Sequence, residues 1–137
     1  MNGTMASPAA ETPAIPAVSV VMPVFNARAT LERAVLSIRR QRGVQVELIC
    51  VDDGSTDGSL ALLRELAASF PGMRVIAQSH QGIVAALNKG LEAARYPLIA
   101  RMDADDVAHP ERLARQAAFL LKHPAVGVLG TRVRSFP

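Results

Sequence analysis

Short apolar runs separated by longer amphipathic stretches dominate the hydrophobic pattern of this chain. The short runs predict five β-strands, at Val18–Met22, Val46–Val51, Arg74–Gln78, Tyr96–Met102 and Val126–Leu129. They are apolar at successive positions rather than at alternate ones, which is typical of strands covered on both faces. The fourth run begins with Tyr96 and Pro97, and we expect it to be a buried strand.

Between these runs, apolar residues recur every three or four positions, as they do along one face of a helix. Thr30 is expected to cap the first helix, and Pro110 suits the first turn of the last one. The four predicted helix faces are Leu31, Ala34, Val35 and Ile38; Leu60, Leu63, Leu66 and Phe70; Ile83, Val84, Leu87, Leu91 and Ala94; and Leu113, Ala117, Leu120 and Leu121. The alternation predicts an α/β fold, a mostly parallel sheet with helices on both faces.

Composition narrows the class of protein. The chain has 137 residues, enough for about one domain, and half of them are hydrophobic. Residues 1–17, rich in Ala, Pro, Ser and Thr, are expected to be a disordered leader, with the domain over residues 18–137. A net charge of +3 with scattered Arg residues argues against a nucleic-acid partner, and Cys50 is expected to be a core residue. Because the sequence shows no transmembrane stretch and no signal peptide, we expect a cytoplasmic protein, with a peripheral place at the cytoplasmic membrane face as the alternative.

The unusual chemistry follows the strands, at Pro23–Asn26, Asp52–Ser55 and Asp103–Asp106. In open parallel sheets, ligands bind beyond the carboxyl ends of the strands. In an extended chain, Asp103 and Asp105 would point to one side, and Ala104 and Asp106 to the other. Two converging carboxylates suit a Mg²⁺ or Mn²⁺ that also holds substrate phosphates, whereas the alternative is a solvated acidic turn.

These three strand ends suit a sugar nucleotide. The Asp53 carboxylate can accept the imide N–H of uracil, while Phe25 or the backbone of Pro23 and Val24 lines the base. Asp103 can reach the ribose or the cation, and Asp105 the cation. Asp52 is expected to hold the turn, and Ser55, Thr56 and Asp57 to cap the next helix rather than bind ligand.

Taken in order, the stretches Val18–Asn26, Val51–Asp57, Leu87–Gly90 and Ala100–Asp106 resemble the successive motifs of family-two glycosyltransferases of the GT-A type. The resemblance implies a Rossmann-like sheet and inverting transfer of a sugar to a saccharide or lipid-linked hydroxyl acceptor in polysaccharide or glycolipid synthesis. We expect the sugar donor to be UDP-linked. The resemblance assigns donor binding and metal binding to matching positions. The donor residues are Pro23, Val24, Phe25, Asn26, Asp53, Asn88, Arg101, Asp103 and Ala104, and the metal ligands for Mn²⁺ or Mg²⁺ are Asp103 and Asp105.

The charged contact to the diphosphate is left without an assigned residue. Leu87 stands where many members of the family carry Arg. Lys89 or Arg101 could supply the missing positive charge, but a solvated Lys and a strand-flanking Arg are equally good interpretations. Arg101 therefore enters the expected site only as a candidate.

The catalytic base that the resemblance implies belongs to a second half of the domain, and the sequence ends on a predicted unfinished strand at Arg132–Pro137. His80, His109 and His123 each lie beside a turn or helix end, which favours structural roles. We therefore expect the amino-terminal, nucleotide-sugar-binding part of such an enzyme, with a catalytically silent binding fragment as the alternative. A receiver domain and a nucleotidyltransferase fit less well, because the first predicted strand ends in Pro-Val-Phe-Asn rather than in acidic residues or a glycine-rich basic loop.

Overall fold

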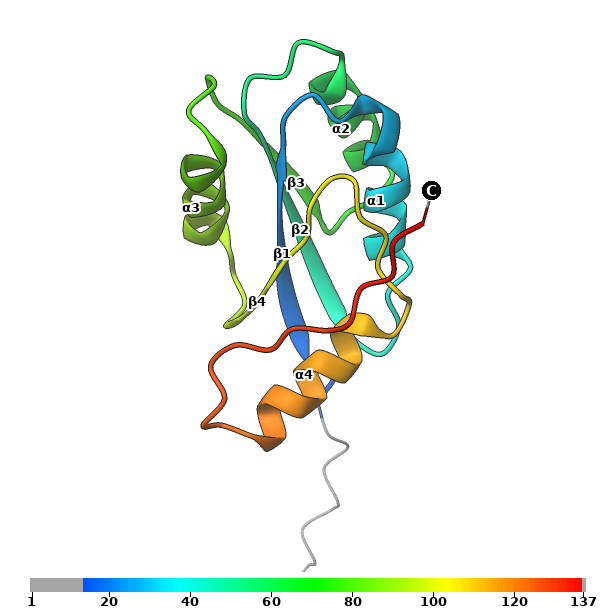
Figure 1. The fold of residues 1–137 in the computed structure, drawn as a ribbon, viewed down its shortest axis with the longest axis vertical. Coiled ribbons are helices and arrows are strands. Elements are labelled where there is room, and N and C mark those ends of the chain that lie inside the picture. Colours follow the sequence, from blue (N-terminus) through cyan, green and yellow to red (C-terminus); the bar gives the residue numbers. More distant parts are fainter. Residues whose placement is uncertain (1–13, 137) are drawn as a thin grey trace, which may run out of the picture.

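The computed structural model describes residues 14–136. It contains four strands and four helices in strict alternation (Figure 1). Their order is β1 (Ala17–Val24), α1 (Arg28–Arg39), β2 (Gln45–Asp52), α2 (Ser59–Ala68), β3 (Met73–Ala77), α3 (Ile83–Ala93), β4 (Leu98–Arg101) and α4 (Arg112–Lys122). Most of the expected leader lies outside the described residues, and β1 begins one residue before its predicted start.

The four strands form one sheet in the order β3-β2-β1-β4, and every neighbouring pair is parallel. Helices cover both faces, with α3 on one side and α1 and α2 on the other (Figure 1). This confirms the predicted α/β class. Along β1, Val20, Met22 and Val24 enter the larger core with α1 and α4, whereas Ile49 and Val51 of β2 pack with Ala86 of α3 on the opposite face.

Pro23 does not end the first strand as the sequence predicted, because its missing N–H falls where no partner is needed. The Val24 carbonyl accepts from Asp53 on the β2 side, and the Val21 carbonyl accepts from Met102 on the β4 side. Pro23 therefore faces the β4 side, and the pairing with β4 stops at Val21. As a result β1 extends to Val24 and carries Phe25 and Asn26 directly at its end.

β4 is an edge strand rather than the buried strand that its apolar run predicted. It has only four residues, and Ile99 is exposed. The predicted fifth strand is also wrong, since residues 124–136 form neither helix nor strand. A strand needs a pairing partner, and Val126–Leu129 instead runs past α4, where Gln116 Nε2 donates to the Leu129 carbonyl at 3.5 Å. The chain from Arg132 to Phe136 likewise forms no strand.

Helix starts differ from the predictions for a local reason. Thr30 lies inside α1, which begins at Arg28. The N-cap residue is Ala27, and the Asp57 carboxylate accepts from the backbone N–H of Arg28 at 3.0 Å and from that of Ser59 at 3.0 Å. Asp57 therefore serves the amino ends of α1 and α2 together, as a carboxylate does well beside the positive end of a helix dipole. No helix in residues 14–136 is long and apolar enough to cross a membrane.

Candidate nucleotide-sugar site

A cleft of about 450 Å³ opens at the carboxyl ends of β1, β2 and β4. It contains most of the residues that the sequence singled out, together with parts of α1 and α3. Its lining comprises Pro23, Val24, Phe25, Asn26, Ala27, Thr30, Asp53, His80, Gly82, Ile83, Ala86, Asp103, Ala104 and Asp105. Asn88 and Arg101 are not among these residues, so their predicted roles in donor binding have no support from the shape of the cleft.

The loop after β1 is held in place by side chains from the loop after β2. The Asn26 N–H donates to Ser55 Oγ at 2.9 Å, and Asn26 Oδ1 accepts from the Thr56 N–H at 2.7 Å. In this position Asn26 adopts a positive φ of 47°, which is uncommon for residues other than glycine. Asp52 closes its own turn as predicted, because its Oδ2 accepts from the Ser55 N–H at 3.1 Å. These contacts fix the direction in which Phe25 projects into the cleft.

Asp53 lies at the end of β2 with only 3% of its surface exposed. Its Oδ1 accepts from Gln78 Nε2 at 2.9 Å and from the Gln81 N–H at 2.7 Å. Its Oδ2 accepts from the Gly82 N–H at 3.0 Å and lies 3.0 Å from His80 Nδ1. Burial raises the pKa of Asp53, but these hydrogen bonds and the nearby His80 lower it by a larger amount. The pKa of Asp53 therefore lies below its ordinary value.

His80 also lines the cleft, although no role in binding was predicted for it. Its ring stacks on Phe25 with 4.3 Å between the ring centroids and 27° between the planes. Gly54, at φ +80°, lets the two loops approach, because a Cβ there would lie 2.8 Å from the His80 backbone nitrogen. The signal that could have found it was its position, since His80 lies in the loop that follows the carboxyl end of β3.

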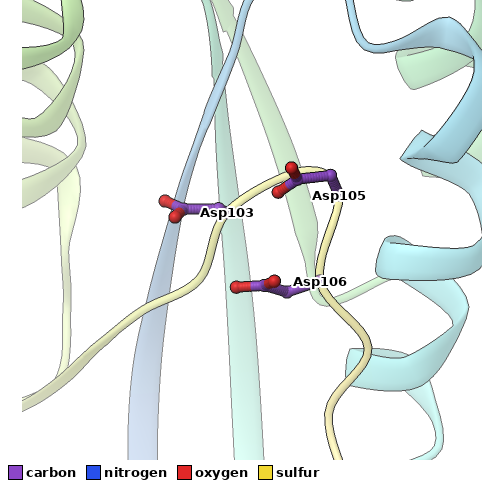
Figure 2. Close-up of side chains that lie close together, drawn as sticks. All are labelled: Asp103, Asp105 and Asp106. Atoms are coloured by element: carbon purple, nitrogen blue, oxygen red, sulfur yellow. The ribbon is translucent and has the colours of Figure 1, made fainter. Parts of the chain in front are cut away.

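The acidic turn lies on the other side of β1 from Asp53, because β1 separates β2 from β4 in the sheet. Asp103, Asp105 and Asp106 each place a carboxylate oxygen within 4.8 Å of the others. Figure 2 shows the three side chains gathered at this turn. The expected convergence of Asp103 and Asp105 is confirmed. Asp106 was predicted to face away but joins them, because the chain is no longer extended: the Asp106 N–H donates to the Asp103 carbonyl at 3.2 Å and closes a turn.

Buried apolar residues hold the acidic turn against the core. Met102, Ala104 and Ala108 are buried in the main core, so the acidic residues between them are directed outward. Thr30 Oγ1 of α1 donates to the Ala104 carbonyl at 2.9 Å, and the Ala108 N–H donates to Ser37 Oγ at 3.0 Å. The acidic residues are therefore held on a packed support rather than on a free loop.

The electrostatics of the acidic turn favour a cation. Burial raises the pKa of Asp106, the charges of Asp105 and Asp103 raise it further, and Arg112 lowers it. The Arg101 guanidinium offsets part of this charge, since its Nη2 lies 3.2 Å from Asp103 Oδ1. Clustered carboxylate oxygens are the donor set that Mg²⁺ and Mn²⁺ prefer, so the residues present fit such an ion.

Comparison with known proteins agrees with this geometry. Residues 19–137 match the family described as Glycosyl transferase family 2. EpsE of Bacillus subtilis strain 168 is 39% identical over 123 residues, which cover 88% of this chain and 44% of EpsE. The chain thus spans less than half the length of this relative.

Two solved structures share the fold. Residues 1–349 of S. aureus TarS, crystallised in complex with UDP, give a TM-score of 0.71 at 25% identity, covering 78% of this chain and 32% of that one. The mannosyltransferase PcManGT from Pyrobaculum calidifontis, in complex with GDP-Man and Mn²⁺, gives 0.73 at 26% identity, covering 79% and 33%. With the strand-end motifs, the parallel sheet and the match over residues 19–137, the chain belongs to glycosyl transferase family 2 and has the GT-A fold.

Proposed function

We propose that this chain binds a nucleotide-diphospho-sugar, with UDP as the nucleotide, for inverting transfer of the sugar to a hydroxyl acceptor in polysaccharide or glycolipid synthesis. The observation that carries the proposal is the cleft, which is lined by Phe25 and Asp53 on one side and by Asp103 and Asp105 of the acidic turn on the other. Two strand spacings separate Asp53 from Asp103, roughly 10 Å, a span that a nucleoside diphosphate bridges. The TarS complex with UDP and the PcManGT complex with GDP-Man support this class of ligand.

Each group in the cleft has a role in this proposal. Phe25 stacks on the base, Asp53 accepts a base N–H, and the backbone from Pro23 to Asn26 forms the floor beside it. Asp103, Asp105 and Asp106 hold a divalent cation, Mn²⁺ or Mg²⁺. When bound, such a cation offsets the charge that develops on the departing diphosphate. Asn88 and Arg101 remain candidates for the diphosphate, with Arg101 placed beside the cluster by its pair with Asp103.

The described residues supply fewer groups for activating an acceptor than for binding the donor. Among residues 14–136 the carboxylates that line the cleft are Asp53, Asp103 and Asp105. Asp53 is engaged by four donors, and the other two belong to the acidic turn. A general base typically contributes about 10²–10⁴-fold to such a reaction. We therefore expect donor binding and slow hydrolysis to exceed acceptor-dependent transfer in this chain, which an assay of UDP release with and without candidate acceptors measures.

The metal requirement gives the sharpest test. Titration calorimetry is expected to show UDP binding roughly tenfold tighter with Mn²⁺ or Mg²⁺ than with EDTA, a difference of about 1.4 kcal/mol. Asp105→Ala should abolish the difference, because it removes one of three clustered carboxylates. Glu65→Ala, at an exposed carboxylate on α2, is the matched control and should retain it. Equal UDP affinity with and without metal in the unmodified chain would contradict the metal site.

A further inference from the structure

The base position proposed above is already occupied by a side chain of the protein. His80 places a flat ring on Phe25, with 4.3 Å between centroids, and points Nδ1 at Asp53 Oδ2 from 3.0 Å. A pyrimidine base in this cleft would make the same two contacts, ring stacking on Phe25 and an N–H donated to Asp53. This inference rests on the proposed function, because it concerns the same cleft.

The proton on His80 follows from its neighbours. Nδ1 faces two acceptors, the Asp53 carboxylate and the Asp53 carbonyl oxygen at 3.1 Å. A nitrogen between two acceptors must carry the hydrogen, so Nδ1 is the donor. His80 therefore presents to Asp53 a ring N–H of the kind that uracil presents with its imide.

Asp53 has no free acceptor position while His80 is in place. A carboxylate offers about four lone-pair directions, and those of Asp53 receive Gln78 Nε2, the N–H groups of Gln81 and Gly82, and His80 Nδ1. The two backbone donors are fixed by the chain entering α3, and Gln78 is partly buried at the end of β3. His80 has 61% of its side chain exposed and is the donor that can leave without breaking the fold.

We propose that His80 is a resident competitor for the nucleobase and a determinant of base specificity, which a bound nucleotide must displace from Phe25 and Asp53. The displacing base has to restore the lost hydrogen bond, so it needs a ring N–H on the edge that meets Asp53. Uracil has one at N3 and guanine at N1, whereas cytosine and adenine present acceptors at the corresponding positions. The mechanism selects UDP and GDP against CDP and ADP.

The test is the sign of the effect of His80→Ala on nucleotide affinity. If His80 occupies the base position for 70–90% of the time, its removal should tighten UDP binding roughly three- to tenfold, because occupancy lowers the apparent affinity by the free fraction. His123→Ala is the matched control, since His123 also stacks on a phenylalanine, Phe119 at 4.1 Å, on α4 outside the cleft. That variant should leave UDP affinity unchanged.

Titration calorimetry of the full chain with UDP and CDP, together with NMR of the histidine rings, decides the matter. We expect UDP to shift the ring signals of His80 but not those of His123, and CDP to bind more weakly than UDP. Weaker or unchanged UDP binding in His80→Ala, with His80 signals unmoved by UDP, would overturn the proposal while leaving nucleotide binding intact. Failure of UDP to bind any of these proteins would instead overturn the proposed function.

Discussion

At the scale of single residues, Gly90 shows how closely α3 lies on the sheet. Glycine inside a helix is unfavourable by about 1 kcal/mol relative to alanine. The structure supplies the reason for it, because a Cβ at position 90 would lie 2.3 Å from Cγ1 of Val21 in β1. Val21 is buried within β1, which is paired on both sides, and cannot retreat.

Gly90→Ala is therefore expected to destabilise the protein even though alanine is the better helix former. Overpacking a filled core costs about 1–3 kcal/mol, and we expect this cost to exceed the gain in helix propensity. Urea denaturation followed by circular dichroism measures the net change. Gly127→Ala is the control, since a Cβ there meets nothing within 4 Å. Equal stability of the two variants would show that α3 can shift away from β1.

At the scale of elements, a buried polar network joins three strands at the end of the sheet away from the cleft. Glu47 of β2 pairs directly with Ser19 of β1 and accepts from its Oγ at 2.6 Å. Arg74 of β3 donates to Glu47 Oε2 at 3.1 Å, and the backbone N–H of Arg95, after α3, donates to Oε1. This network was not predicted, because these strands were interpreted as apolar at successive positions and only the strand register brings the polar residues together.

Glu47 should make stability depend on pH. Burial raises its pKa, but the hydrogen bonds from Ser19 and Arg95 and the charge of Arg74 lower it more, so the folded-state pKa lies below the ordinary value of 4.5. The stabilisation is therefore complete above that value and is lost as pH falls through the folded-state pKa. We expect Glu47→Gln to cost about 1–3 kcal/mol at pH 7, and the difference from the unmodified chain to shrink below about pH 4.

Chemical denaturation at a series of pH values measures this difference. Glu111→Gln is the control, because Glu111 pairs with Arg115 on the surface of α4 and an exposed pair contributes about 0–1 kcal/mol. The other carboxylates are the same in both proteins, so their contributions to the pH dependence of stability cancel when the two are compared. A constant gap between the Glu47→Gln and unmodified curves from pH 7 to pH 3 would mean that Glu47 is not held charged by the network.

Local features of this molecule could be predicted from its sequence, whereas features that depend on distant partners could not. Helical and strand periodicities located all eight observed elements, and the strand ends predicted where the cleft would be. Features that depend on distant partners were wrong or missed. Val126–Leu129 has the composition of a strand but pairs with no strand, Asp106 joins the acidic turn through a bend that no periodicity encodes, and His80 meets Asp53 across 27 positions of sequence.

At the scale of the whole molecule, one cleft combines two chemically different halves on either side of β1. One half offers Phe25 from the end of β1 and Asp53 from the end of β2, and the half after β4 offers Asp103 and Asp105 of the acidic turn. The sheet fixes the distance between them, so a ligand gains from both halves only if it carries both a base and a diphosphate. Without a cation, the acidic half should repel the diphosphate rather than bind it.

Uridine and UDP should therefore respond differently to metal. Uridine reaches only the base half, so its affinity should be the same with Mn²⁺ or with EDTA, whereas UDP affinity should rise with Mn²⁺. Asp105→Ala should reduce UDP affinity in the presence of Mn²⁺ and leave uridine affinity unchanged, because Asp105 belongs to the acidic half. Calorimetric titrations with both ligands in both conditions provide the comparison. Metal-dependent binding of uridine would contradict the division, because it would place the cation next to the base rather than next to the diphosphate.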